Sequence, residues 1–508
     1  MASASAMQTT STTKGPFRYQ RHEPEKTLLY RTLAREWETW HAERQADTSR
    51  SLLPEYVARE MAAYLRCGIL DQGFLILSCE GCGEKLPVAF SCKRRGFCPS
   101  CCAKRMSEIS VHLIDNVLPH APYRQWVTTF PYPLRYWMAA SRQLTNTVHA
   151  EVARMIEIYY LDKAERRGID KPVAGGVTFV QRFGSALNLN VHFHTVALEG
   201  VFSVSGKEPV FYQLPGPTDE EVSDLVAAVA HAVIARLRAK GYLGDGEEAT
   251  LSAACLDTVF QDSEQLVAAV SASASMRIAF GPREGQRVRR IGHAFGYEGE
   301  GARLVGKRCA SANGFTLHAN RYIGMKDRIG LERLLAYGAR GSFSNQRLSL
   351  ADPDDPSGDL TYSLKTPWRD GTEAILISPA ETIEKLVALI PPPYAHLSRY
   401  FGVLASHSRW RRKIILRPDV KRGFVATPNG IVRMTWALLL ARVFATDIVR
   451  CPACGQPLQP EHFELVVEPA LIHGILHALG LAGRAPARAP PRSIFDETDI
   501  DQSTHYAD

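Results

Sequence analysis

Two histidines two residues apart give this 508-residue chain its clearest opportunity for metal chemistry. They are His192 and His194, in the segment Asn188-Leu-Asn-Val-His-Phe-His-Thr195. On a β-strand both imidazoles would point to one face, while Val191 and Phe193 would point into a core. Two adjacent imidazoles supply half of a divalent-metal site, and such a metal polarises a phosphate oxygen. The pair therefore predicts phosphoryl-transfer chemistry, and the alternative is a pair of histidines on an exposed strand face.

A third metal ligand would have to come from a neighbouring element. Residues 176–183 and 187–198 read as two strands joined by a short polar link, which predicts a hairpin. In the favoured register Gln181 faces the histidine pair across this hairpin. An amide oxygen is an acceptable ligand for Mg²⁺ or Mn²⁺, so Gln181 is the predicted third ligand.

The cysteines suggest a second, structural metal. The pairs Cys79-x2-Cys82 and Cys98-x2-Cys101 are fifteen residues apart, a spacing typical of a four-thiolate zinc site. A closed site of this kind leaves no position for water, so it folds a small module and does not catalyse. Reduced cysteines in a core are the alternative interpretation.

Other cysteines are left over from this predicted site. Cys92 and Cys102 are spare, and either can replace one of the four ligands. Cys451-x2-Cys454 is half of a similar site, but no second pair follows it. We therefore expect a degenerate zinc ribbon without a metal near residue 451.

Basic residues are concentrated in two places. The chain carries 60 Lys and Arg against 53 Asp and Glu, a net charge of +7, which is a mild bias toward a polyanionic partner. A second basic cluster surrounds Trp410, between Arg409 and Arg422, and the alternative interpretation of either cluster is a solvated charged face. The first cluster lies among the cysteines, where its charge suits contact with a DNA or RNA backbone, and consists of Lys93, Arg94, Arg95, Lys104 and Arg105.

The elements that position these residues read as a mixture of helices and hairpin strands. Apolar spacing predicts a long helix over 141–167 and another over 325–337. A third helix should open at Thr218, where Glu221 completes a capping box. Together with the strands, these elements predict an α+β fold with an antiparallel sheet.

The chain shows no signal for secretion or for a membrane span. The N-terminus is polar, and no run of about 18 apolar residues occurs. We expect a cytoplasmic protein, in which clustered cysteines more often hold a metal than form disulfides.

At this point the sequence resembles a known family, the rolling-circle transposases of the insertion-sequence common-region type. These belong to the wider group of HUH endonucleases, which cut single-stranded DNA and are named for a His-hydrophobic-His motif. The resemblance covers roughly residues 50–485, and its blocks occur in the family's order. They are Phe90-Ser-Cys-Lys-Arg-Arg-Gly-Phe-Cys-Pro-Ser-Cys101, Asn190-Val-His-Phe-His-Thr195, Leu331-Glu-Arg-Leu-Leu-Ala-Tyr337, Ser344-Asn-Gln-Arg-Leu348, Tyr362-Ser-Leu-Lys-Thr-Pro-Trp-Arg-Asp370, Cys451-Pro-Ala-Cys-Gly455 and Ile475-Leu-His-Ala-Leu-Gly-Leu481.

The resemblance implies that a helical tyrosine is the nucleophile, and the family position matches Tyr337. It would attack single-stranded DNA to leave a 5′-phosphotyrosine and a free 3′-OH, with Mg²⁺ or Mn²⁺ on the histidines. Tyr322 is the runner-up. Some members carry a second tyrosine four residues later, but this chain has Gly341 there, which favours the single-tyrosine form. Arg340 and Arg333 are near enough in sequence to assist phosphate binding, or simply to solvate the helix end, and Arg347 is also a candidate DNA-binding residue.

The resemblance also implies the partners, and together with composition and apolar spacing it predicts the domain order. The partners are single-stranded DNA at the ends of an element and its target DNA, in the bacterial cytoplasm near the nucleoid, with a homo-oligomer left open. The alternatives are an HUH replication initiator or relaxase, and a non-catalytic zinc-containing DNA-binding protein. The predicted domains are a disordered tail (1–20), a helical N-terminal region (21–78), a zinc-binding module (79–107), an HUH catalytic domain (108–380), a mostly helical C-terminal region with the incomplete cysteine pair (381–480) and a second disordered tail (481–508).

Overall fold

A computed structural model describes most of the chain, and its contacts form two units. The first unit contains the described residues of Met1–Glu23, Gly68–Phe90 and Asp419–Ala485, and the second those of Pro24–Cys67 and Ser91–Pro418. The residues described are 22–244, 256–292, 306–368, 370–415, 424–426, 432–434, 451, 453–456 and 463–481. Both predicted tails, except residue 481, lie outside these ranges, as do Arg417, Lys421 and Arg422 of the second basic cluster.

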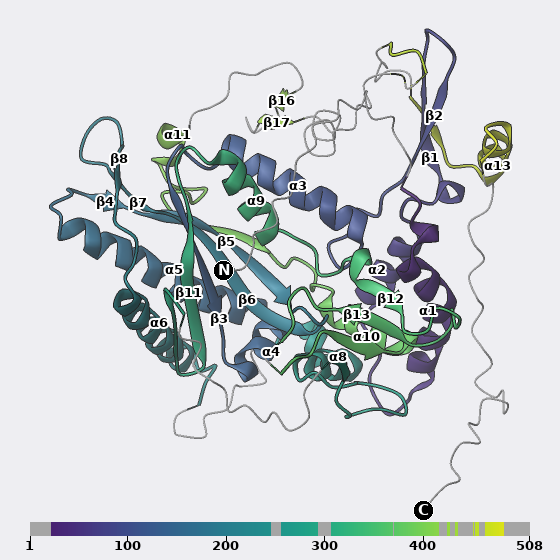
Figure 1. The fold of residues 1–508 in the computed structure, drawn as a ribbon, viewed down its shortest axis with the longest axis horizontal. Helices are drawn as coiled ribbons and strands as arrows, with labels where there is room; N and C mark the ends of the chain where they lie inside the picture. The colour runs from purple at the N-terminus through teal and green to yellow at the C-terminus, as the bar shows by residue number, and fades with distance from the viewer. Residues whose placement is uncertain are drawn as a thin grey trace, which may run out of the picture. The chain divides into compact units, whose positions relative to one another are not determined.

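The second unit is built on a six-stranded sheet with the order β10-β11-β3-β6-β5-β15, in which every neighbouring pair is antiparallel. The hairpin β5–β6 supplies two neighbouring inner strands of this sheet, beside the edge strand β15 (Figure 1). Since β5 and β6 are buried along almost their whole length, both faces of the sheet must be covered. The strands are β3 (Tyr123–Thr129), β5 (Gly175–Phe183), β6 (Leu189–Leu198), β10 (Cys309–Ala312), β11 (Phe315–Ile323) and β15 (Ser398–Gly402).

Helices cover the two faces of this sheet. On one face, α3 (Pro99–Asn116) and α9 (Arg328–Gly338) pack on the sheet through a shared apolar core that includes Leu113, Leu335 and Phe179. The other face is covered by α4 (Tyr132–Ala140), α5 (Arg142–Glu165), α6 (Asp219–Ala239) and α8 (Glu264–Ala274), and Figure 1 shows α3 and α9 across the sheet from α5 and α6.

Smaller elements complete the second unit. Strands β12 (Leu348–Leu350), β13 (Leu360–Ser363), β14 (Ala374–Ile377) and β9 (Arg289–Ile291) form a four-stranded sheet, and β4 (Pro172–Val173), β7 (Gly200–Ser203) and β8 (Val210–Gln213) form a three-stranded one. Helix α10 (Pro379–Leu389) begins with a capping box. The remaining helices are η1 (Pro24–Lys26), α1 (Leu28–Ala46), α2 (Glu55–Arg66), α7 (Thr258–Gln261), η4 (Asn345–Arg347) and α11 (Arg411–Ile414).

The first unit joins two segments that are far apart in the sequence. Strand β1 (Phe74–Ser78) pairs with β2 (Lys85–Ala89) on one edge and with β18 (Phe463–Val466) on the other. A small core around Phe74, Ile76 and Val466 packs against α13 (Pro469–Ala478). This unit also contains η2 (Leu70–Gln72), β16 (Phe424–Ala426) and β17 (Val432–Met434).

The predicted α+β fold with antiparallel sheets is confirmed. The long helix α5 begins at Arg142 after its N-cap Ser141, and α6 begins with the predicted Thr218–Glu221 capping box. The C-terminal region, expected to be mostly helical, also contributes strands β15 to β18. The stretch predicted as one module, 79–107, is divided between the two units after Phe90. None of the described helices is long and apolar enough to cross a membrane.

Candidate active site and cysteine clusters

The two histidines point to the same face of the central sheet, as their spacing predicts. His192 and His194 lie on β6, and their Nε2 atoms are 3.1 Å apart. Both rings are buried, with exposed fractions of 9 % and 5 %. They face the side of the sheet that α3 and α9 cover, whereas Phe193 packs against His149 of α5 on the opposite side. Strand β6 therefore presents two adjacent imidazole nitrogen atoms at a buried position on this face of the sheet.

Burial keeps both imidazoles neutral, which is the form that binds metals. Desolvation lowers the pKa of His192 to about 4 and holds the pKa of His194 well below its ordinary value. The Nδ1 atom of His192 lies 2.8 Å from the carbonyl oxygen of Asn190. Because a carbonyl oxygen only accepts, this Nδ1 carries the ring proton and Nε2 keeps its lone pair.

The second ring is held by Gln125 of β3. The amide Nε2 of Gln125 and the Nδ1 of His194 are 2.9 Å apart, and the Gln125 side chain is buried. With the amide nitrogen toward the ring, Nδ1 accepts and Nε2 of His194 carries the proton; turning the amide so that its oxygen faces Nδ1 leaves Nε2 with a lone pair for a metal. Sequence reasoning did not identify Gln125. The strand register could have identified it. Thr129 of β3 pairs with His192, and Gln125 lies four residues earlier on the same strand, so its side chain faces the same side of the sheet as the histidines.

Gln181 takes the predicted position beside the histidines. It is paired with His192 in the β5–β6 register. Its amide nitrogen donates to the carbonyl oxygens of Tyr337 and Gly338, at 2.8 and 2.9 Å. Its Oε1 is buried and accepts no hydrogen bond from the described residues.

The unpartnered oxygen of Gln181 and the adjacent Nε2 atoms of the two histidines are donor types that bind divalent cations. Only two groups of three or more His, Cys, Asp or Glu side chains converge in the described part of the chain, and both consist of cysteines alone. A cation at the histidine pair would therefore need an amide oxygen, water or the substrate itself as a further ligand.

The predicted nucleophile lies against this pair. Tyr337 is in the last turn of α9, half-buried, and its ring centroid is 5.5 Å from that of His194. The two rings are almost perpendicular, at 87°. Helix α9 can approach β5 so closely because residue 338 is glycine, where a Cβ would lie 2.4 Å from the Phe179 ring.

Two cations flank the Tyr337 ring. The Arg340 guanidinium carbon is 4.6 Å and the Lys365 Nζ is 4.7 Å from its centroid. The Nε of Arg340 is buried and donates to no atom that the structure describes. Positive charge of this kind attracts the phosphate of a bound strand.

The alternative tyrosine lies on the wrong side of the sheet. Tyr322 of β11 pairs with Arg124 of β3, which in turn pairs with Ala197 of β6. Side chains alternate along a strand, so the row of Ala197 faces away from the histidines. Tyr322 is also exposed, and its ring lies beside the Arg124 guanidinium.

A second tyrosine cannot occupy the position four residues after Tyr337. A Cβ at Gly341 would lie 2.5 Å from the Cβ of Cys102, a buried cysteine of α3. Any side chain at residue 341 would therefore displace α3.

The predicted DNA-binding residues divide into two kinds. Arg95, Arg105 and Arg340 line a cavity of about 240 Å³ that Gln181 also lines. Lys93 and Arg94 are exposed and Lys104 is half-exposed in the same region. Arg347 has a different environment, because its guanidinium donates to the carbonyl oxygens of Ser363 and Ser185 and so holds two segments of the protein together.

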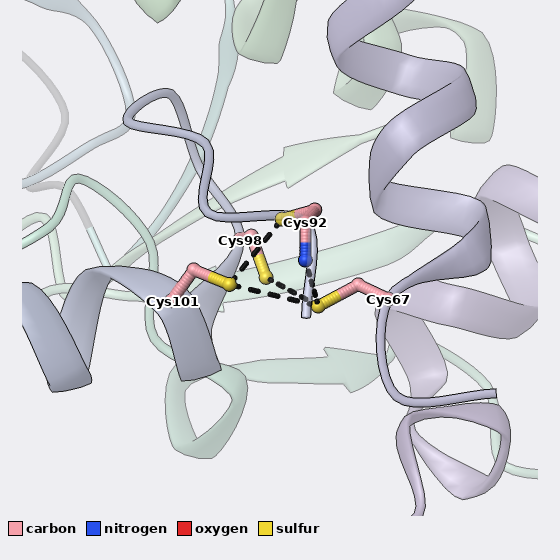
Figure 2. Close-up of side chains that lie close together, drawn as sticks. All are labelled: Cys67, Cys92, Cys98 and Cys101. Carbon is pink, nitrogen blue, oxygen red and sulfur yellow. Dashed lines mark hydrogen bonds between the residues drawn. The ribbon is translucent and has the colours of Figure 1, made fainter. Parts of the chain in front are cut away.

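The predicted zinc quartet is wrong as a single site, because its two pairs belong to different clusters. Cys98 and Cys101 converge with Cys67 and Cys92, as Figure 2 shows. Cys67 follows the end of α2, Cys92 lies in the loop before α3, and Cys98 caps α3. Cys102 points away from this cluster, toward the carbonyl oxygen of Gly96.

The sulfur atoms of this first cluster have zinc-like spacing. Cys92 and Cys101 are 3.3 Å apart, Cys67 and Cys101 3.6 Å, and Cys98 and Cys67 3.7 Å. A tetrahedral site with zinc–sulfur bonds of about 2.3 Å places its sulfurs about 3.8 Å apart. The spare Cys92 was recognised from the sequence as an alternative ligand, but Cys67 was not, because it has no cysteine within three residues.

Cys79 and Cys82 converge instead with Cys451 and Cys454, in the first unit. The expectation of a pair without a partner near residue 451 is therefore wrong: its partner pair precedes it in the sequence. The loop length between cysteine pairs carries no information about which pairs meet.

Two family models match the chain. Residues 34–130 match a "Transposase zinc-binding domain" of the IS91 type, and residues 175–412 match a family described as "Putative transposase". The first range contains Cys67, Cys92, Cys98 and Cys101 and also Cys79 and Cys82, and the second contains His192, His194 and Tyr337. No curated protein and no solved structure matches.

Proposed function

Because the chain belongs to the transposases that carry the IS91-type zinc-binding domain, we propose that it moves a mobile element by cutting and joining single-stranded DNA through Tyr337. A transposase acts on DNA and cleaves it, so the proposal concerns the strand, the nucleophile and the metal. The observation that carries it is the position of Tyr337, whose ring lies 5.5 Å from that of His194.

His192, His194 and Gln181 would hold the divalent cation. The supporting observations are the adjacent Nε2 atoms and the buried, unpartnered Oε1 of Gln181. Mg²⁺ or Mn²⁺ bound there would withdraw charge from a non-bridging oxygen of the scissile phosphate. The neutral state of both imidazoles keeps their lone pairs available to the ion.

The strand-transfer step needs few groups. The phenol oxygen of Tyr337 attacks phosphorus, the bond from phosphorus to the 3′-oxygen breaks, and the phenolic proton is released as the 3′-oxygen gains one. The product is a 5′-phosphotyrosine and a free 3′-OH, and attack by a 3′-OH on the phosphotyrosine reverses the reaction without ATP. Arg340 and Lys365 place positive charge beside the phosphate during both steps.

The single tyrosine supports a sequential transfer of strands. Gly341 and Cys102 leave no room for a second tyrosine at the family spacing. One protein chain would then form one phosphotyrosine at a time, which suits the rolling-circle mobilisation of an insertion sequence. A second nucleophile would have to come from a second chain or from reuse of Tyr337.

The first cysteine cluster supports the structural role proposed for zinc. Cys67, Cys92, Cys98 and Cys101 would bind one ion, which fixes the start of α3 against the end of α2. Helix α3 carries Arg105 and packs on α9, so the ion would stabilise the basic cavity and the helix of Tyr337 together.

A covalent-adduct assay tests the proposal. Single-stranded oligonucleotides carrying the element's end are incubated with the protein and Mn²⁺, and adducts are separated on a denaturing gel. We expect an adduct from the wild type and from Tyr322→Phe, and none from Tyr337→Phe, which should still bind DNA. An adduct from Tyr337→Phe would assign the nucleophile elsewhere, and no adduct from the wild type despite tight binding would favour a non-catalytic DNA-binding protein.

A further inference from the structure

We propose that Cys79, Cys82, Cys451 and Cys454 form a second zinc site, which closes a zinc ribbon from two distant segments of the chain. All four residues belong to the first unit, and their Sγ atoms lie within 4.8 Å of one another. Cys79 and Cys82 lie within the range that matches the zinc-binding domain, whereas Cys451 and Cys454 lie outside both matched ranges, so neither match supplies all four ligands.

The two cysteine pairs have the same backbone geometry. In the first knuckle, the amide of Gly83 donates to the carbonyl of Cys79, and the amide of Cys79 donates to the carbonyl of Glu84. In the second, the amide of Gly455 donates to Cys451 and the amide of Cys451 donates to Gln456. Both glycines have positive φ, at 73° and 75°, which favours glycine after each pair.

The sulfurs are arranged for a tetrahedral ion. The two contacts between the knuckles, Cys79 with Cys454 and Cys82 with Cys451, both measure 3.6 Å. This matches the sulfur separation of about 3.8 Å expected around one zinc, and exceeds by far a disulfide length of about 2.05 Å. All four are free thiols in the structure.

The ion would hold together a unit with little other support. Cys79 and Cys454 are 375 positions apart, and the described core of the unit is a small cluster around Phe74, Ile76 and Val466. A small core usually needs a metal or disulfide to fold, so the pairing of β18 with β1 should depend on the ion.

Metal content of the full-length protein tests this site. We expect two zinc ions per chain in the wild type by elemental mass spectrometry, one in the double variant Cys451→Ser/Cys454→Ser, and two in Cys309→Ser, the control at a free cysteine of β10. One ion in the wild type that persists in the double variant would overturn the proposal. Where the double variant is insoluble, Co²⁺ substitution of the wild type distinguishes the outcomes, because two Co²⁺ ions with tetrahedral thiolate spectra support the site and one overturns it.

A different observation points to a second ligand site, on the sheet face opposite the histidines. Arg182 of β5 is buried, with an exposed fraction of 8 %, and its Nη1 donates to the carbonyl oxygen of Ala139. Its Nε and Nη2 are buried as well but donate to nothing within the described parts of the chain. A buried guanidinium with two unused donors is costly without an anion to accept from it.

The cavity that Arg182 lines is strongly basic. It measures about 360 Å³ and is also lined by Arg142 and Arg399. The carboxylate of Asp257 lines it too but pairs with Arg142 at 2.9 Å. The lining residues therefore keep a net positive charge.

An aromatic side chain lies beside these charges. Tyr394 also lines the cavity, yet 79 % of its surface is exposed. Its φ is +63°, a backbone conformation that a tyrosine rarely adopts and that often marks a functional site. An exposed ring beside basic groups is the arrangement that binds a base and its phosphate in single-stranded nucleic acid.

We infer that this cavity binds one nucleotide of the single-stranded DNA substrate, with its phosphate on Arg182 and Arg399 and its base stacked on Tyr394. The inference rests on the proposed function, since it assumes that the same strand reaches Tyr337. It extends the DNA path from the catalytic face around the β5–β15 edge to the other face of the sheet.

Equilibrium binding of a fluorescent single-stranded oligonucleotide tests this site. All variants carry Tyr337→Phe, so that no adduct forms, and Kd is measured by anisotropy. We expect Tyr394→Ala to weaken binding roughly 5- to 100-fold, because a stacked base is worth about that factor, and Tyr394→Phe to bind normally. Tyr212→Ala, at an exposed tyrosine of β8, is the control and should bind normally.

Three further results complete the test. An unchanged Kd in Tyr394→Ala would overturn the inference, whatever the adduct assay shows. Arg182→Met should also weaken binding and lower its dependence on salt, and Tyr394→Ala with intact Tyr337 should still form an adduct at saturating DNA. Failure of the proposed function would instead appear as no adduct from the wild type, so the two failures are distinguishable.

Discussion

Replacing Gln125 should weaken metal binding at the histidine pair without touching a ligand. The side chain is buried and lies 2.9 Å from the Nδ1 of His194, so it orients that ring. Gln125→Leu keeps a similar volume but leaves the buried Nδ1 without a partner, which costs about 1–3 kcal/mol. Loss of such an outer hydrogen bond typically lowers metal affinity about 10- to 100-fold, which is the same range of free energy.

The Gln125 amide can present either its oxygen or its nitrogen to the His194 ring, so a second variant can test which orientation favours metal binding. Gln125→Glu presents only oxygen, so Nδ1 must carry the proton and Nε2 keeps its lone pair for the metal. We therefore expect Gln125→Glu to bind Mn²⁺ at least as tightly as the wild type, and Gln125→Leu to bind it 10- to 100-fold more weakly.

Isothermal titration with Mn²⁺ on the zinc-loaded protein measures both effects. Gln265→Leu is the matched control, because Gln265 is also a buried glutamine, on α8, and its amide nitrogen donates to the carbonyl oxygen of Arg44 instead of contacting an imidazole. The reasoning is refuted if Gln125→Leu keeps the wild-type Kd within twofold, or if Gln265→Leu weakens Mn²⁺ binding as much.

Three further predictions concern stability and the position of α9. Lys385→Met should raise the free energy of unfolding by about 1–4 kcal/mol at neutral pH, because the buried Nζ has no hydrogen-bond partner in the described structure and its desolvation outweighs the attraction of Glu384 and Glu381. Burial lowers the pKa of Lys385 from 10.5 to about 8. The stability gained by Lys385→Met should therefore be full below pH 8 and decrease as the pH rises toward 10.5, which urea unfolding at several pH values measures. Glu199→Ala should cost about 3–5 kcal/mol in the same assay, because it leaves the Arg124 guanidinium, now 2.7 Å from Glu199, buried and unpaired. Gly338→Ala should cost about 1–3 kcal/mol and slow adduct formation with saturating DNA, since its Cβ would push α9 from Phe179; a normal rate would contradict this.

Local patterns in the sequence were sufficient for several parts of the candidate site. The alternation of side chains along a strand placed His192 and His194 on one face, and the short link of the hairpin placed Gln181 in register with His192. The capping box at Thr218 located the start of α6 for the same reason, because a cap involves residues within one helical turn. The resemblance to rolling-circle transposases selected Tyr337 among the 18 tyrosines of the chain.

Contacts between residues that are distant in the sequence could not be predicted from local patterns. The approach of Tyr337 to His194 depends on how α9 packs on β5, and the role of Gln125 depends on which strand lies beside β6. The order of strands in a sheet is decided by the packing of the whole core, to which a pattern of four or five residues contributes little.

The cysteines separate the two kinds of information most clearly. By itself, the sequence determined that thiolate pairs are present and that they suit zinc, because a CxxC pair is a local structure with a fixed bite. Only the tertiary structure decided that Cys98 and Cys101 join Cys67 and Cys92, while Cys79 and Cys82 join Cys451 and Cys454. The physical reason is that every thiolate offers the metal the same chemistry, and closing a longer loop costs little extra entropy. The partners are therefore chosen by the elements that carry them, such as the end of α2 beside α3 in one cluster and β1 paired with β18 in the other.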